Sequence, residues 1–215
     1  MKIFVDSSDI RAIRYLSNML PIEGVTTNPT LVAKAPGNPL TSLSELKTYL
    51  GDKEFHVQVV SLDTEDMIRD AQKLMDTLGR DVFIKVPVIP GGFAAIKKLS
   101  EEGISVTATA VYTPFQAMLA ANCGAKRVAP YVSRIDRMGC DGIEVVKKIQ
   151  NILSKNWPET EIIAASIKNA HQVETLSEIG IYAVTLTPDL IHSLAENPLT
   201  RRDAENFVAD LDRLF

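Results

Sequence analysis

Three observations predict a closed (β/α)8 barrel, the TIM-barrel fold, for this chain of 215 residues. Short runs rich in β-branched residues recur along the sequence, segments with apolar residues at helical spacing separate them, and this unit repeats eight times at about 27 residues each. Alternating strands and helices form a parallel sheet with right-handed crossovers, and eight units in so short a chain favour a closed barrel over an open sheet. We therefore expect one α/β domain over residues 1–215.

The predicted strands are apolar, β-branched runs that are too short for helices. In chain order they are Ile3–Val5, Gly24–Thr26, Phe55–Val60, Val82–Val86, Ser105–Ala110, Arg127–Tyr131, Ile162–Ala165 and Ala183–Leu186.

The predicted helices carry apolar residues at helical spacing. Between the strands they are Ser8–Leu20, Leu40–Leu50, Thr64–Leu78, Gly92–Glu102, Thr113–Cys123, Asp141–Asn156 and Asn169–Ile179. Pro188–Leu194 follows the last strand, and an extra amphipathic C-terminal helix, Leu199–Leu214, lies within residues 198–215. Its Phe207, Leu211 and Leu214 form a stripe with no barrel position, so we expect this helix to pack on a neighbouring subunit.

The composition excludes several classes of function. Hydrophobic residues make up 46% of the chain, enough for one sizeable core. With 23 basic and 27 acidic residues and a net charge of −4, no basic patch suggests nucleic acid. The apolar stretches are shorter than the roughly 20 residues of a membrane span, and the N-terminus turns polar at Asp6, unlike a signal peptide. We expect a cytoplasmic protein with neither a membrane nor a nucleic-acid partner.

The cysteines and histidines predict no metal site. Cys123 and Cys140 lack a CxxC spacing and are interpreted as buried or half-buried thiols. His56, His171 and His192 have no partner at ligand spacing. Because GxGxxG and Walker patterns are absent too, we expect neither a metal nor an organic cofactor.

Lys85 places a charged amine inside the apolar run Val82–Val88. Burial in such a strand favours the neutral amine, which is a nucleophile toward carbonyls, so Lys85 is a candidate for Schiff-base chemistry. The alternative is a lysine that snorkels from an edge strand or pairs with a buried carboxylate.

Polar residues end almost every predicted strand, at the rim where the βα loops of a barrel build the active site. In chain order they are Asp6; Thr26, Thr27 and Asn28; Gln58; Lys85; Thr107 and Thr109; Tyr131, with Arg134 just beyond; Ser166; and Thr185 and Thr187. Packing alone would allow Val, Ile or Ala at these positions, so we expect a polar site there.

Some of these residues have a second interpretation. Asp6 and Asn28 can simply cap the helices that follow them. Gln58 lies either in the barrel or on the helix layer, where its burial requires partners and it could position a water. Tyr131 can be an ordinary barrel aromatic whose hydroxyl finds a partner.

Arg134 and Ser166 suit a phosphate, which is best held by an arginine fork, a hydroxyl and the amides of a helix start. The segment Ser166–Asn169 opens the helix after the seventh strand, where barrel phosphate sites are common, and Lys168 adds charge. The alternative is a salt bridge from Arg134 to Asp136 together with a serine cap.

A Thr-Thr-Asn-Pro loop followed by a lysine in the fourth strand is a highly specific combination. The segments that share in the resemblance are Asp6, Gly24–Pro29, Ile84–Pro87, Ala110–Tyr112, Ala129–Asp136, Asp141–Gly142 and Ala164–Ser166. Over essentially the whole chain, this set resembles the transaldolase family, and most closely its fructose-6-phosphate aldolase branch.

The resemblance implies a class I aldolase that cleaves or forms fructose 6-phosphate from dihydroxyacetone and glyceraldehyde 3-phosphate. It implies that Lys85 forms the Schiff base, that Asp6 and Asn28 bind donor hydroxyls, and that Arg134 and Ser166 hold the phosphate. It also implies a homo-oligomer, a pentamer or a decamer of two rings, with the C-terminal helix crossing to a neighbour.

The remaining site residues bear on the branch. Gln58 and Tyr131 stand where transaldolases proper usually carry glutamate and phenylalanine, so this pair resembles the aldolase. We expect Tyr131 to take a substrate proton through a water held by Gln58 and Thr109, and Thr26 to complete the substrate-binding set.

Three other functions stay open at this point. The chain could be a transaldolase that transfers a dihydroxyacetone unit between sugar phosphates in the pentose phosphate pathway. It could be another lysine-dependent barrel enzyme, such as a deoxyribose-phosphate aldolase or a dehydratase, or a phosphosugar-binding barrel without catalysis.

Overall fold

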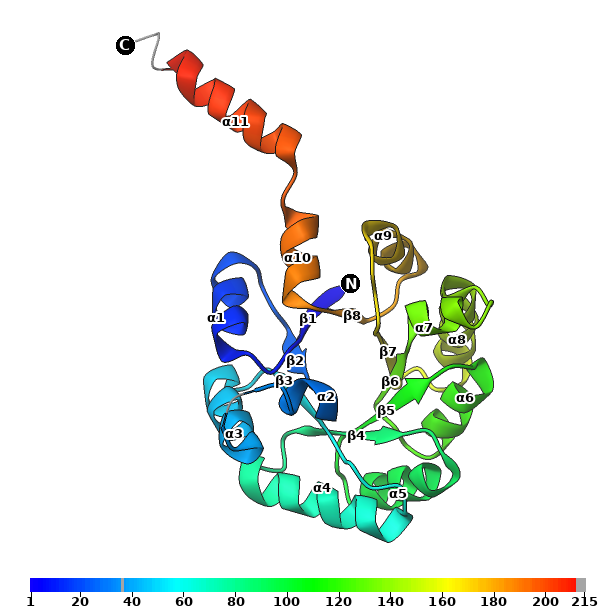
Figure 1. The fold of residues 1–215 in the computed structure, drawn as a ribbon. Helices are drawn as coiled ribbons and strands as arrows, with labels where there is room; N and C mark the ends of the chain where they lie inside the picture. The colour runs from blue at the N-terminus through cyan, green and yellow to red at the C-terminus, as the bar shows by residue number, and fades with distance from the viewer. Residues whose placement is uncertain (36, 212–215) are drawn as a thin grey trace.

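The computed structural model describes residues 1–35 and 37–211 and confirms the (β/α)8 barrel. Eight parallel strands follow one another in chain order around the ring, and β8 pairs with β1 to close it (Figure 1). The strands are β1 Lys2–Asp6, β2 Gly24–Thr26, β3 Glu54–Gln58, β4 Phe83–Pro87, β5 Val106–Val111, β6 Arg127–Pro130, β7 Glu161–Ala164 and β8 Ala183–Leu186. Each predicted strand is present, with bounds that differ by at most two residues.

The helices surround the barrel, except for the last one. They are α1 Ile10–Met19, α2 Pro29–Val32, α3 Pro39–Leu50, α4 Thr64–Leu78, α5 Pro90–Glu101, α6 Pro114–Asn122, α7 Val132–Arg137, α8 Gly142–Asn156, α9 Ala170–Ile179, α10 Pro188–Ala195 and α11 Pro198–Leu211. The helical period did not reveal α2 or α7, because helices of four and six residues are too short to show one, although Asn28 followed by Pro29 did indicate a helix start at α2.

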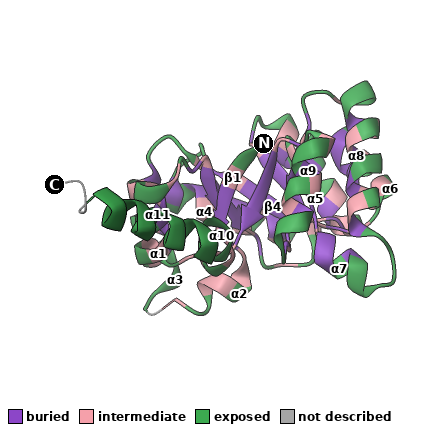
Figure 2. Cartoon of the chain, turned by 90° about the horizontal axis from the view of Figure 1, so that it is seen from above, coloured by how far each residue is buried: buried purple, intermediate pink, exposed green. Residues whose placement is uncertain are grey.

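Alternation along each strand separates the helix layer from the barrel interior. In β4, Ile84 and Val86 are fully buried in the core between the strands and the helices, while Lys85 between them points inward. Helix α3 covers its part of the ring with Leu43, Leu46 and Leu50. Figure 2 shows the buried strands at the centre and the exposed outer faces of the helices.

A polar network fills the interior at the N-terminal ends of the strands. The Glu54 carboxylate accepts hydrogen bonds from Arg127 Nη2 at 2.6 Å, from the Tyr182 hydroxyl at 3.1 Å and, at 3.1 Å, contacts His56 Nε2. Arg127 Nη1 also pairs with Glu161 at 2.7 Å. We call Glu54, His56, Arg127, Glu161 and Tyr182 the barrel plug. Because it occupies this end, an open pocket remains at the C-terminal ends of the strands.

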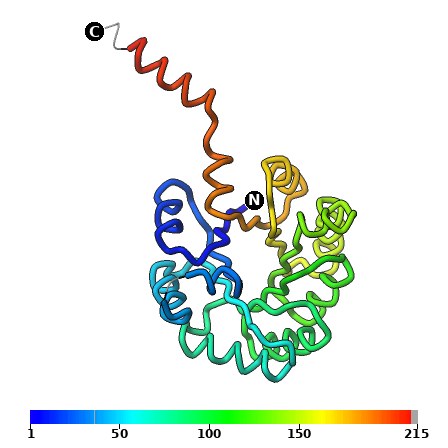
Figure 3. The backbone as a smooth tube through the Cα atoms, in the orientation of Figure 1, coloured from blue at the N-terminus to red at the C-terminus, as the bar shows by residue number. Residues whose placement is uncertain are grey.

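Helix α11 extends away from the barrel, and its end lies far from the N-terminus (Figure 3). None of its residues is buried, and the side chains of Phe207 and Leu211 are 72% and 53% exposed. Leu214, the third residue of the predicted stripe, lies outside the described residues. Within the described part of the chain, no helix has the length and apolar character needed to cross a bilayer.

Candidate active site

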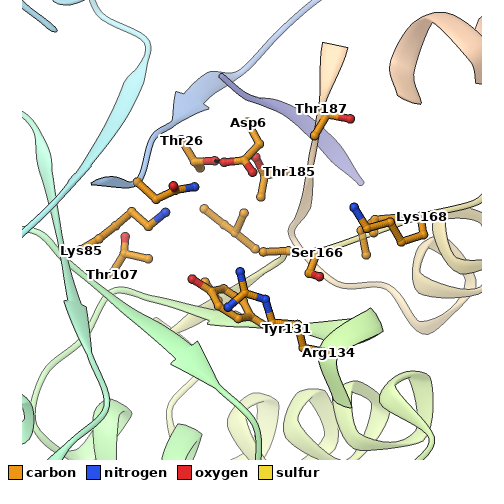
Figure 4. Close-up of a pocket in the computed structure, with 15 residues that line it drawn as sticks. Asp6, Thr26, Lys85, Thr107, Tyr131, Arg134, Ser166, Lys168, Thr185 and Thr187 are labelled. Atoms are coloured by element: carbon orange, nitrogen blue, oxygen red, sulfur yellow. Dashed lines mark hydrogen bonds between the residues drawn. The ribbon is translucent and has the colours of Figure 1, made fainter. Parts of the chain in front are cut away.

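A pocket opens at the C-terminal ends of the barrel strands, and side chains from every strand except β3 line it (Figure 4). Its lining consists of Asp6, Thr26, Asn28, Lys85, Thr107, Ala129, Tyr131, Arg134, Ile163, Ala165, Ser166, Ile167, Lys168, Thr185 and Thr187. Seven of the nine residues predicted for the site are thus brought together: Asp6, Thr26, Asn28, Lys85, Tyr131, Arg134 and Ser166.

Lys85 is buried at the side of this pocket, with 5% of its surface exposed. Its Nζ donates a hydrogen bond to the Thr27 carbonyl oxygen at 2.7 Å. Burial lowers the pKa of the amine below its usual range, and the negative charge of Asp6 opposes this shift. The snorkelling alternative is wrong, because β4 lies between β3 and β5 in a closed ring. The amine also forms no ion pair with any described residue.

Asp6, Thr26 and Thr185 bring three strands together at one side of the pocket. The Thr26 hydroxyl donates to Asp6 Oδ1 at 2.7 Å and lies 2.7 Å from the Thr185 hydroxyl. Because Thr26 has only one hydroxyl proton, Thr185 is the donor of the second bond. Asp6 is not a helix cap, since Asp9 caps α1. This leaves the Asp6 carboxylate oriented into the pocket (Figure 4).

Asn28 serves both purposes that the sequence left open. Its Oδ1 accepts a hydrogen bond from the Leu31 amide at 3.0 Å, so it caps α2, with Pro29 at the first helical position. It also lines the pocket beside Lys85. Capping therefore fixes the side chain at the rim of the pocket rather than excluding it from the site.

Tyr131 is held in place from two sides. Its hydroxyl lies 3.1 Å from the Thr109 hydroxyl, and the Arg134 guanidinium stacks over its ring at 4.4 Å from the centroid. Burial raises the pKa of the phenol, although the hydrogen bond with Thr109 and the charge of Arg134 act in the opposite direction. At neutral pH the phenol is therefore protonated and can donate a proton.

Positive charge gathers on the opposite side of the pocket from Lys85, where Arg134 and Lys168 lie with Ser166 (Figure 4). The predicted alternatives for these residues are wrong. Asp136 accepts from the Gly142 amide at 2.8 Å and from Gln172 at 2.9 Å, and it forms no ion pair with Arg134. The helix after β7 is capped by Asn169, not by a serine. The two cations are thus available to an anionic ligand.

Ser166 adopts a left-handed backbone with a φ of 60°. A residue with a Cβ pays roughly 1–2 kcal/mol for this conformation. The start of α7 contacts this backbone, because the Ser133 amide donates to the Ser166 carbonyl oxygen at 3.1 Å. Such strain in a pocket is typical of a functional residue.

Gln58 and Thr109 lie at the margin rather than in the pocket lining. Thr109 is fully buried and reaches the pocket through the Tyr131 hydroxyl. Gln58 pairs in register with Lys85, yet it lines a second, apolar pocket among α2, α3 and α4 that shares Asn28 with the first. Its Oε1 is buried and has no hydrogen-bond partner among the described residues.

Sequence reasoning missed some of the pocket. Thr107, Thr185 and Thr187 were recognised as strand ends but not assigned to the site, and Ile163 and Ala165 were not considered. Ile163 and Ala165 could have been predicted, because they stand two residues apart and the alternation of β7 places both on its inward face. No group of three or more potential metal ligands occurs among residues 1–35 and 37–211.

The fold and the pocket together define a (β/α)8 barrel with a buried lysine amine on one side of its cavity and two cationic side chains, Arg134 and Lys168, on the other. The family described as Transaldolase/Fructose-6-phosphate aldolase matches residues 3–215. The chain belongs to this family and is an enzyme of the transaldolase and aldolase class. A sugar-phosphate substrate fits the family and the charges of the pocket.

Individual relatives carry both names. A "Probable transaldolase" from Nitrosopumilus maritimus is 39% identical over 217 residues, which cover 100% of this chain and 96% of the relative. A "Probable transaldolase" from Exiguobacterium sibiricum is 36% identical over 99% of both chains. A "Probable fructose-6-phosphate aldolase" from Streptococcus pneumoniae is 36% identical over 98% of this chain and 96% of the relative.

The charge of Asp6 raises the pKa of Lys85, so Asp6→Asn is expected to lower that pKa further. A lower pKa gives more neutral amine at a given pH, and the reactivity of Lys85 then rises at lower pH than in the wild type. Competitive acetylation across roughly pH 6 to 11, read by peptide mass spectrometry, measures this midpoint. Asp63→Asn, which keeps the cap of α4, is the control and should leave it unchanged. A shift to higher pH in Asp6→Asn would contradict the electrostatic coupling.

Proposed function

We propose that the protein is a class I aldolase that cleaves and forms fructose 6-phosphate, with Lys85 as the Schiff-base residue. The observation that carries the proposal is the buried Lys85 amine, with its lowered pKa, opposite Arg134, Ser166 and Lys168. A neutral amine attacks a ketone, while the cations hold a phosphate at the far end of the same molecule. The reaction needs neither a metal nor an organic cofactor, because the protonated imine is itself the electron sink.

In the cleavage direction, Lys85 Nζ attacks C2 of the ketose and water leaves, which gives an iminium ion. Removal of the proton on the C4 hydroxyl then lets the C3–C4 bond break, and the bonding electrons move through C3 to the iminium nitrogen. Glyceraldehyde 3-phosphate departs. Protonation of the remaining enamine at C3 and hydrolysis of the imine release dihydroxyacetone and regenerate the amine.

Tyr131 is the group proposed to move the C4 proton. Its phenol is protonated at neutral pH, so Tyr131 is proposed to relay the proton rather than to hold it: the C4 proton leaves through a water hydrogen-bonded to the phenol, and one proton is returned by the same route to C3 of the enamine after the aldehyde departs. Thr109 orients the phenol from 3.1 Å. Gln58 is proposed to hold that water, since its buried Oε1 has no partner in the described part of the chain.

The two ends of the substrate are proposed to bind at opposite sides of the pocket. Asp6, Thr26 and Asn28, at the ends of β1 and β2, face the hydroxyls of the three-carbon donor. Arg134 and Ser166 bind the phosphate, with Lys168 as an additional cation. This orientation places the carbonyl carbon beside Lys85.

A transaldolase is the second candidate, because relatives of similar identity carry that name. In that reaction an acceptor aldose intercepts the enamine on Lys85 before a proton does. The presence of a phenol at Tyr131 favours the aldolase, since the phenol supplies the proton that ends the reaction by hydrolysis. The cytoplasmic location remains a prediction.

Trapping with borohydride tests the Schiff base. After incubation with fructose 6-phosphate and reduction, we expect a dihydroxyacetone-sized adduct on the peptide that contains Lys85. Lys85→Ala should lose the adduct and lower cleavage by roughly a thousandfold or more. Lys98→Ala, at an exposed position, is the control and should retain both the adduct and the cleavage activity. Appreciable turnover in Lys85→Ala would sink the assignment.

Tyr131→Phe tests the branch. Removal of the phenol is expected to lower aldol cleavage by about 10²- to 10⁴-fold, the usual contribution of an acid–base group. Transfer to an acceptor aldose should fall less, because transfer does not require protonation of the enamine. Both rates are measured on the same preparation, and trapping of the adduct shows that Lys85 is still reactive. Equal losses in the two reactions would contradict this role of Tyr131.

Helix α11 is proposed to pack on a second copy of the chain in a homo-oligomer, a pentamer or a decamer. Phe207, Val208 and Leu211 lie on one side of this helix and are all more than half exposed. An apolar stripe without a partner in its own barrel is typical of an interface.

Sedimentation measures the mass of the assembly. The wild-type protein should sediment as a multiple of the 23.6 kDa chain, and Phe207→Asp should shift it toward the monomer, because a carboxylate would be buried in the interface. Arg202→Asp, at an exposed polar position of the same helix, is the control. A wild-type protein that is monomeric at micromolar concentration would rule out the oligomer.

A further inference from the structure

A chain of hydrogen bonds connects the barrel plug to the pocket. His56 Nδ1 lies 2.8 Å from the Thr107 hydroxyl, and His56 Nε2 lies 3.1 Å from Glu54 Oε2. His56 is fully buried, and Thr107 lines the pocket as the register partner of Lys85. The closed end of the barrel is therefore in contact with the reactive end through one imidazole ring.

The partners of Glu54 determine the tautomer of His56. Burial opposes ionisation of Glu54, but hydrogen bonds from His56 and Arg127 outweigh it and lower the carboxyl pKa to about 2. Burial lowers the pKa of His56 to about 4, so the ring is neutral at pH 7. A neutral imidazole facing a carboxylate with Nε2 must carry its proton there, and Nδ1 is then an acceptor.

The same logic orients Thr107. Since His56 Nδ1 can only accept, the Thr107 hydroxyl must donate its single proton downward to the ring. Its remaining lone pairs are directed toward the pocket. Thr107 thus presents an acceptor, not a donor, next to Lys85, and the two side chains lie together on one side of the pocket (Figure 4).

The ring of His56 has little freedom to turn over and break this arrangement. Phe83 stacks on it at 4.6 Å between centroids, with an interplanar angle of 18°, and Phe4 meets it edge-on at 5.4 Å. Arg127 in turn fixes Glu54 through two hydrogen bonds. The polarity of the Thr107 hydroxyl is therefore set by groups that never touch the pocket.

We propose that Glu54, His56 and Thr107 form a relay that holds the Thr107 hydroxyl as a hydrogen-bond acceptor toward the substrate. This acceptor selects ketones that carry a hydroxyl on a carbon next to the carbonyl. Thr107 is the specificity residue, and His56 and Glu54 are positioning residues. The selectivity rests on the proposed function, since it concerns the ketone that reacts with Lys85.

The first test examines the relay in the free protein and needs no activity. Two-bond proton–nitrogen NMR spectra of the wild-type protein at pH 7 should show His56 as the neutral tautomer with its proton on Nε2. In Thr107→Val the Nδ1 resonance should move toward the value of a nitrogen that accepts no hydrogen bond, while the tautomer is kept. A proton on Nδ1, or an imidazolium ring, would overturn the relay.

The second test examines selectivity with acetone, hydroxyacetone and dihydroxyacetone as a series. Loss of one neutral hydrogen bond should reduce kcat/KM for the hydroxylated ketones by about 3- to 10-fold relative to acetone in Thr107→Val, measured as the rate of borohydride-trapped adduct. Thr107→Ser keeps the hydroxyl and should restore the wild-type ratio. Equal changes for all three ketones in Thr107→Val would overturn the role in selectivity.

The two proposals fail in different ways. If none of the three ketones gives an adduct with the wild-type protein, the Schiff-base function is wrong and the proposed selectivity is wrong with it. The His56 tautomer then still decides whether the relay exists. If adducts form and their ratio is insensitive to Thr107, the Schiff-base function stands and the selectivity is refuted.

Discussion

Pairing of β8 with β1 is the constraint on which the rest of the structure depends. A closed ring has no edge strand, so every inward side chain must be accommodated in one confined interior. Lys85 cannot reach bulk water past an edge, and the loss of hydration follows from ring closure rather than from its immediate neighbours. The lowered pKa of its amine is therefore a property of the barrel as a whole.

Charged groups inside the barrel are arranged differently at its two ends. At the N-terminal end, the partly buried charges of Glu54, Arg127 and Glu161 pair with one another, which offsets their loss of hydration. At the C-terminal end, Arg134 and Lys168 face the pocket without an ion pair among the residues described. The charges at the N-terminal end are thus paired within the protein, whereas the two cations at the C-terminal end face the open pocket.

The sequence predicted the barrel and most of the rim because both depend on local periods. Strand ends could be recognised by polar residues, and closure brought those ends together. Contacts between distant residues were not predictable. The His56 imidazole contacts Glu54, two residues away, and Thr107, 51 residues away, and only the folded barrel brings Thr107 to the imidazole. Capping was ambiguous, because Asp6 and Asp9 stand close together and only the backbone geometry shows that Asp9 is the cap. The period of two placed Gln58 on the opposite face of its strand from Val57 and Val59, but it left open whether that face is the barrel interior or the helix layer, and it did not indicate the pocket that Gln58 lines.

The left-handed backbone of Ser166 has a consequence for how the protein can change during evolution. Glycine at this position would remove the conformational cost, although part of that gain would be offset by the greater entropy of a glycine in the unfolded chain. It would also delete the hydroxyl that faces the pocket. Threonine would keep the hydroxyl, but a β-branched side chain tolerates this backbone poorly. Relief of the backbone cost and retention of the pocket hydroxyl are thus opposed at a single residue, since neither substitution achieves both.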